Sequence, residues 1–240
     1  MKAETNMNVE PQFWEEFIGD IPCVAAVKNN WQVILAELES QIQETNAMWL
    51  WSVPRVNVTR EEFKSPDNNA DQKLYTGTSW KMMGTGVEVE SAGFTGLGEE
   101  VGRRVVKMKT KMPYEEALKK LQSTLPKTVA ILSEYSDRRE MCNTSLSVVA
   151  PGTVINPHRG DPSHMRVHIG LKCDPACSIT VGNEEVGYES RVWEPGKLVA
   201  FKDGGNYCHS VTHNGTMDRW ILLFDMPLDY VRTVVSHEHL

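Results

Sequence analysis

The spacing of hydrophobic residues divides the chain into a helical first half and a strand-rich second half. Apolar residues at 13, 14, 17 and 18, and then at 27, 31, 34, 35, 38 and 42, recur at the spacing of amphipathic helices. Pro113 favours another helix, whose apolar face runs to Leu125. Residues 52–100 are rich in Gly, Ser, Asn and Asp, and this composition predicts loops with short strands.

From residue 143 onward, short strands alternate with turn residues. We expect strands near 145–149, 164–171, 177–182, 186–193, 197–201, 208–213 and 219–225. Regular short strands indicate a sandwich or barrel. Helices followed by strands predict an α+β fold, in which a helix-rich part (1–142) packs on a strand-rich core (143–230) within one domain, 1–240.

Composition limits the classes of partner. The 240 residues are 40% hydrophobic and 24% charged, which is typical of globular proteins, and the net charge of −7 gives no bulk attraction to nucleic acid or anionic lipid. No apolar run approaches the ~18 residues of a membrane helix, and the first residues lack a secretory signal. We therefore expect a cytoplasmic protein with no nucleic-acid or membrane partner and five reduced cysteines, and the oligomeric state stays open.

Histidine and arginine gather in the strand-rich half. Five of the seven histidines lie between positions 158 and 213. In the strand 166–171, Arg166 and His168 share one face because side chains alternate, and a barrel interior holding them needs an anion or ligand. Arg219 begins an otherwise apolar strand and, if buried, needs an acidic partner. That partner is Asp225 or Glu189 in one reading and a bound dicarboxylate in another.

His158 and His209 come from different predicted strands, so they could bind one metal and leave positions open, as in non-haem Fe(II) oxygenases. The carboxylate ligand of such sites normally follows two residues after the first histidine, where this chain has Gly160. Asp161 is one residue too far along for the usual geometry. The sequence therefore predicts a two-histidine site without its third protein ligand, and whether Asp161 or water completes it stays open.

An ordered set of short motifs spans residues 147–225. It comprises SVVAPGTVINPHRG (147–160), RVHIGL (166–171), WEPGK (193–197) and FKD (201–203), together with Cys177, His209 and Arg219. This set resembles the aspartyl/asparaginyl β-hydroxylase family of Fe(II)- and 2-oxoglutarate-dependent oxygenases, whose members similarly lack the carboxylate ligand. The resemblance implies a double-stranded β-helix, a jelly-roll or cupin-like barrel, with supporting N-terminal helices.

The resemblance also implies a role for each matching residue. His158 and His209 would bind the iron, and Arg219 would pair with the distal carboxylate of 2-oxoglutarate, which Ser147 and His168 would also contact. Arg166 would face the substrate and could hold a substrate carboxylate.

The activity that the resemblance implies is hydroxylation of an unactivated C–H bond, with O2 consumed and succinate and CO2 released. The substrate would be amino-acid-like, peptidyl or a small metabolite. Two alternatives stay open: a 2-oxoglutarate-dependent halogenase that uses the open ligand position, and a non-catalytic cupin-like protein that binds a metal or small molecule. The segment between Phe201 and His209 is two residues longer than the family pattern, which leaves the substrate undefined.

Overall fold

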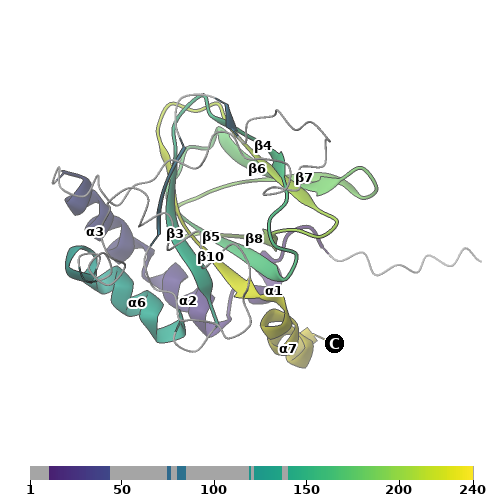
Figure 1. The fold of residues 1–240 in the computed structure, drawn as a ribbon, viewed down its shortest axis with the longest axis horizontal. Coiled ribbons are helices and arrows are strands. Elements are labelled where there is room, and N and C mark those ends of the chain that lie inside the picture. The colour runs from purple at the N-terminus through teal and green to yellow at the C-terminus, as the bar shows by residue number, and fades with distance from the viewer. Residues whose placement is uncertain are drawn as a thin grey trace, which may run out of the picture.

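Two five-stranded antiparallel sheets form the body of the molecule, seen in a computed structural model that describes residues 11–43, 75–76, 80–84, 119, 122–136 and 140–239 (Figure 1). One sheet has the order β1 (Tyr75–Thr76), β4 (Val154–His158), β9 (Cys208–His213), β6 (Cys177–Asn183) and β7 (Gly187–Val192). The other has the order β2 (Trp80–Gly84), β3 (Cys142–Val149), β10 (Arg219–Pro227), β5 (His164–Lys172) and β8 (Leu198–Lys202). From β3 onward, consecutive strands lie in opposite sheets except at the β6–β7 hairpin, so the fold is the predicted α+β double-stranded β-helix.

The helices cover the outer face of the second sheet. They are α1 (Glu15–Ile18), α2 (Pro22–Asn29), α3 (Trp31–Gln43), α6 (Pro126–Ser136) and α7 (Leu228–His239). In Figure 1, α2, α3 and α6 lie together against β3, β5 and β10. None of the described helices is long and apolar enough to cross a membrane.

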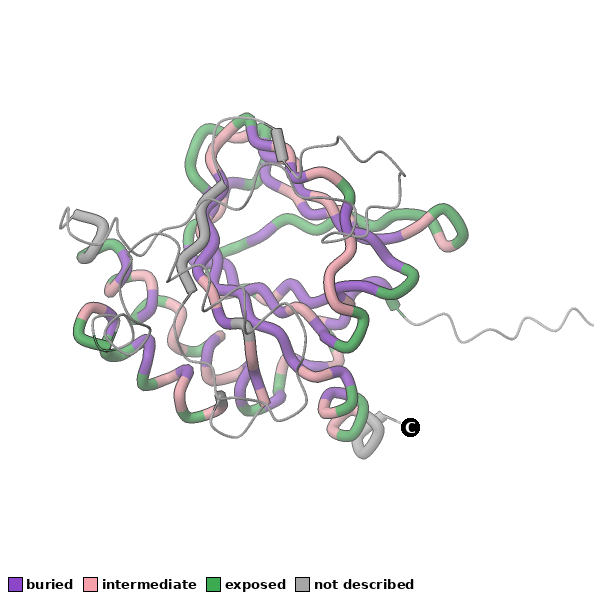
Figure 2. The backbone as a smooth tube through the Cα atoms, in the orientation of Figure 1, coloured by how far each residue is buried: buried purple, intermediate pink, exposed green. Residues whose placement is uncertain are grey.

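Strand alternation creates two separate cores. In β5, Val167 and Ile169 point outward and pack with the helices, as predicted, while Arg166 and His168 lie on the other face. Apolar residues from both sheets fill the space between them, including Phe201 of β8. Figure 2 shows this buried interior and, in contrast, the exposed tip of the β6–β7 hairpin. Burying one large apolar side chain stabilises the fold by about 1.5–3 kcal/mol.

The seven predicted strands correspond to β3 and β5–β10, with small shifts at their ends. The prediction missed β4, because Pro157 lies within it and proline cannot donate to a sheet. The structure accommodates this residue at a register shift between Ile155 and His158, where strand pairing is interrupted.

The continuous helical stripe at 27–42 is divided into α2 and α3. Asn30 ends α2, since its backbone N–H bonds to Val27 O and its side chain donates to Ala26 O at 2.8 Å. Most of the helix expected from Pro113 lies outside the described residues. The single domain over 1–240 stays a prediction.

Candidate active site

Two histidines face each other across neighbouring strands of the first sheet. His158 ends β4 and is in register with His209 of β9, and their ring centroids lie 4.1 Å apart. Both side chains are buried. His158 Nδ1 lies 2.8 Å from Asn156 O, which fixes a tautomer that donates from Nδ1 and carries its lone pair on Nε2.

Burial keeps both rings neutral. It lowers the pKa of His158 to about 4, and together with the neighbouring His158 it lowers the pKa of His209 well below its ordinary value. Neutral imidazoles have the lone pair that a metal requires, and two of them suit a first-row transition metal such as iron. Within the described parts of the chain, no group of three His, Cys, Asp or Glu residues could hold a metal ion. The assignment of His158 and His209 as metal ligands stays a prediction.

Asp203 fills the space beside this pair where a third ligand is expected. Its carboxylate is 1% exposed, and Oδ1 lies 3.7 Å from His209 Nε2. A Cβ placed on Gly160 would overlap this carboxylate, so a larger residue at that position requires Asp203 to move. Asp203 Oδ1 is buried without a hydrogen-bond partner among the described residues, and a bound cation would satisfy such an acceptor.

Asp161 turns away from the histidine pair. Its carboxylate accepts hydrogen bonds from the backbone and hydroxyl of Ser163, at 2.8 and 2.6 Å. Only its backbone N–H contacts the site, where it donates to Asp203 Oδ2 at 3.2 Å.

The positive charge of Arg166 is balanced by two carboxylates of the protein. Its Nε and Nη2 donate to the two carboxylate oxygens of Asp225 at 2.8 and 3.0 Å, and Nη2 lies 2.9 Å from Asp203 Oδ2. Burial opposes the charge, but Asp203 and Asp225 outweigh it and raise the pKa of Arg166. Burial raises the pKa of Asp203 to about 7, and Asp225 adds to that rise. The expected contact of Arg166 with a substrate stays a prediction, and any such contact would use its remaining N–H groups.

Arg219 presents the opposite situation, because it is buried and no carboxylate of the described residues pairs with it. It is 2% exposed, and Nη2 donates to Ser147 Oγ at 3.0 Å, while Nε has no partner in the described structure. Neither predicted protein partner reaches it: Asp225 pairs with Arg166, and Glu189 pairs with Arg191 at 3.2 Å. Of the two readings of Arg219, the ion pair with Asp225 or Glu189 is therefore not found, and the bound dicarboxylate stays a prediction. Burial lowers the pKa of Arg219 to about 10.

The structure brings the predicted cosubstrate residues together. Ser147 and His168 lie on the strands that flank β10, and the pairing places Ile221 opposite Ser147 and Leu223 opposite His168. His168 Nδ1 is buried without a hydrogen-bond partner among the described residues, and burial and Arg219 lower its pKa well below the ordinary value.

The phenyl ring of Phe201 connects this cluster to the histidine pair. Its centroid lies 5.3 Å from the His168 ring and 4.9 Å from the His209 ring. The site thus combines two neutral metal-binding nitrogens with a neighbouring buried cation.

Two residues of the site received no role from the sequence. Asp203 was recognised only as part of a motif, although an acid directly after an apolar strand is a usable signal. Trp193 directly follows β7 and is 1% exposed, and its ring lies under the guanidinium of Arg219, with Cζ 4.4 Å from the centroid. No spacing rule predicts a contact between a residue that follows β7 and one at the start of β10.

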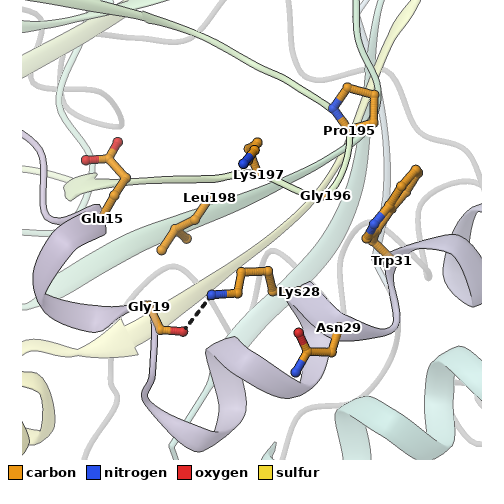
Figure 3. A pocket seen from close by; sticks show the side chains of 9 residues that line it. All are labelled: Glu15, Gly19, Lys28, Asn29, Trp31, Pro195, Gly196, Lys197 and Leu198. Atoms are coloured by element: carbon orange, nitrogen blue, oxygen red, sulfur yellow. Dashed lines mark hydrogen bonds between the residues drawn. The ribbon is translucent and has the colours of Figure 1, made fainter.

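A surface pocket of about 450 Å³ lies elsewhere, between the N-terminal helices and the start of β8 (Figure 3). Its lining includes Glu15, Lys28, Trp31 and Lys197 and none of the predicted site residues. Lys28 Nζ donates to Gly19 O at 3.2 Å, so this lysine is already engaged by the chain.

Comparison with known proteins gives partial matches to curated relatives. The mouse and human aspartate beta-hydroxylase domain-containing protein 2 are each 35% identical over 78 residues, which is 32% of this chain and 20% and 19% of theirs. Mouse aspartyl/asparaginyl beta-hydroxylase is 31% identical over 105 residues, covering 42% of this chain and 13% of that protein. The chain therefore matches about a fifth or less of the length of these relatives.

Similar solved structures include a recombinant oxalate oxidase in complex with glycolate, with a TM-score of 0.31 and 16% identity over 37% of this chain and 42% of that chain. A cupin domain from Bordetella pertussis has a TM-score of 0.27 and 14% identity over 35% of this chain and 78% of that chain. The family model for aspartyl/asparaginyl beta-hydroxylase matches a much longer part of the chain, residues 28–227. The chain belongs to the aspartyl/asparaginyl beta-hydroxylase family.

Proposed function

We propose that this protein is an Fe(II)- and 2-oxoglutarate-dependent dioxygenase that hydroxylates an unactivated C–H bond. The substrate is an amino-acid-like molecule, a peptide or a small metabolite. The observation that carries the proposal is Arg219, a buried cation without a carboxylate among the described residues. Burial of a permanent charge is costly, and an anionic ligand offsets that cost.

His158 and His209 would hold the iron through neutral imidazole nitrogens. The iron, when bound, supplies activation of O2 coupled to oxidation of 2-oxoglutarate to succinate and CO2. Arg219 would pair with the distal carboxylate of 2-oxoglutarate, while Ser147 holds the guanidinium and the neutral His168 contributes a further polar nitrogen. All these side chains are buried, so the protein would exclude water and fix the cosubstrate relative to the metal.

The halogenase alternative is weakened by Asp203. A halide would have to occupy the space beside the histidine pair that Gly160 leaves, and the carboxylate of Asp203 already fills that space. A negatively charged group also repels a halide. The non-catalytic metal- or ligand-binding alternative is distinguished by experiment.

The test is an anaerobic titration of the purified protein with Fe(II) and then 2-oxoglutarate, following the weak visible charge-transfer band of the chelate. The band should require both His209 and Arg219, so His209→Ala and Arg219→Ala should each lose it at moderate 2-oxoglutarate. Arg191→Ala is the matched control, since that arginine is exposed and paired with Glu189. A folded protein that gives no band, or a band indifferent to Arg219, would overturn the proposal in favour of a non-catalytic barrel.

A further inference from the structure

We infer that Trp193 is a positioning residue for the cosubstrate: its indole face holds the guanidinium of Arg219 charged and oriented while leaving that charge available to a bound carboxylate. The inference rests on the proposed function. Trp193 is 1% exposed and lies among apolar neighbours between the sheets, so burial alone would classify it as an ordinary core residue.

The geometry joins three side chains. Arg219 Cζ lies 4.4 Å from the centroid of the Trp193 ring, within the range of a cation–π contact. The His168 ring lies 5.9 Å from the same indole at a tilt of 32°. Trp193 thus contacts the two residues that we propose for the distal end of 2-oxoglutarate, from a segment that belongs to neither of their strands.

The two buried arginines of the site show why an aromatic face matters. Arg166 pairs with the carboxylates of Asp203 and Asp225. They stabilise its charge, but they also balance it, so less of it is available to a ligand. Among the described residues, Arg219 has the Ser147 hydroxyl and the Trp193 face but no carboxylate. An aromatic face attracts a cation through its quadrupole but carries no net charge. It therefore stabilises the empty site without competing with an incoming anion.

Unused hydrogen-bonding groups at the same place support this assignment. His168 Nδ1 and Arg219 Nε, whose side chains both contact the Trp193 ring, are buried without a hydrogen-bond partner in the described structure. Groups of this kind cost free energy unless they are satisfied, and a carboxylate has several acceptor positions. Their clustering around one guanidinium is typical of a preformed anion site and unusual for an ordinary apolar core.

The test compares two probes that differ only at the distal end. 2-Oxoglutarate and 2-oxovalerate both present a keto acid to the metal, but 2-oxovalerate has a methyl group in place of the distal carboxylate. Affinities come from the charge-transfer band of the anaerobic Fe(II)-loaded protein. Trp193→Leu removes the aromatic face, and Trp193→Phe keeps a weaker one. Trp220→Leu is the control, because Trp220 stacks instead with Lys172, at 5.8 Å on the helix-covered side.

Trp193→Leu should weaken 2-oxoglutarate binding by about 10- to 30-fold, because the guanidinium is no longer held in the orientation that receives the carboxylate, and leave 2-oxovalerate binding unchanged. Trp193→Phe should recover most of the loss, and Trp220→Leu should bind both probes like the parent. If the leucine variant does not fold, the ratio of the two affinities in the phenylalanine variant decides, and it should fall by a few fold.

Three results would overturn the inference. One is an equal loss for both probes, which indicates general packing; another is no loss in either variant; the third is a phenylalanine variant as weak as the leucine variant, which assigns the effect to the indole N–H. In all three the parent still binds 2-oxoglutarate through Arg219, so the proposed function stands. A parent protein that binds no 2-oxoglutarate overturns both.

Discussion

Substitution of Gly160 by alanine should destabilise the protein through one identifiable contact. The new methyl group would overlap the carboxylate of Asp203, which is held by Arg166 at 2.9 Å and by the backbone N–H of Asp161. Asp203 must then leave its position. Arg166 keeps its pairing with Asp225, so the loss is one charge-assisted hydrogen bond plus imperfect repacking, and we expect a cost of about 2–4 kcal/mol.

The assay is urea unfolding followed by tryptophan fluorescence, with Asp203→Ala as the second arm of a double-mutant cycle. Removing the carboxylate creates room, so Gly160→Ala should cost less than about 0.5 kcal/mol in the Asp203→Ala background. Gly152→Ala is the control. Gly152 has a φ of +75° and open space around its Cβ position, so its cost of about 1 kcal/mol is backbone strain that Asp203→Ala cannot relieve. Additive costs for Gly160→Ala and Asp203→Ala would refute the steric reasoning.

Three further predictions concern stability. Glu37 accepts hydrogen bonds from two backbone N–H groups at the start of α6, so Glu37→Ala should cost about 1–2 kcal/mol in urea unfolding, whereas the exposed Glu39→Ala should cost under about 0.5. Ser147→Ala should cost about 1–3 kcal/mol by removing an acceptor from Arg219, and saturating Fe(II) and 2-oxoglutarate should recover part of it in a thermal melt. Three backbone N–H groups lower the pKa of Asp174, so its charged form stabilises the fold above that pKa. Asp174→Asn should therefore reduce the melting temperature at pH 7 and have little effect once the pH falls below the lowered pKa. An equal loss of melting temperature at both pH values would contradict this pH dependence.

The sequence predicted the barrel well because its strands alternate cleanly. Val167 and Ile169 face the helices and His168 faces inward, as the period of two requires. Strand β4 was not predicted, because the proline beside His158 argues against a strand. The structure accommodates it at a register shift, which depends on the pairing of two strands and is not visible in one segment of sequence. Local pattern therefore indicated His158 as a candidate metal ligand but did not predict the strand that carries it.

Charge pairing was the part that sequence could not resolve. Arg166 and Arg219 both lie on inward faces, and Asp225 was an equally reasonable partner for either. The sheet register decides, because β10 pairs with β5 so that Asp225 lies opposite Arg166. Among the described residues, two carboxylates therefore balance the charge of Arg166 and none pairs with Arg219, which is why we propose Arg219 as the anion site.

The fit between Gly160 and Asp203 also constrains how this site can change over evolutionary time. A carboxylate at position 160 is costly in this chain as long as Asp203 occupies the space, because Asp203 has to move. Replacing Asp203 by a small residue first removes this cost, but that intermediate has a carboxylate at neither position. The two positions are therefore coupled, and a designer who wishes to install a third protein ligand beside His158 should begin at residue 203.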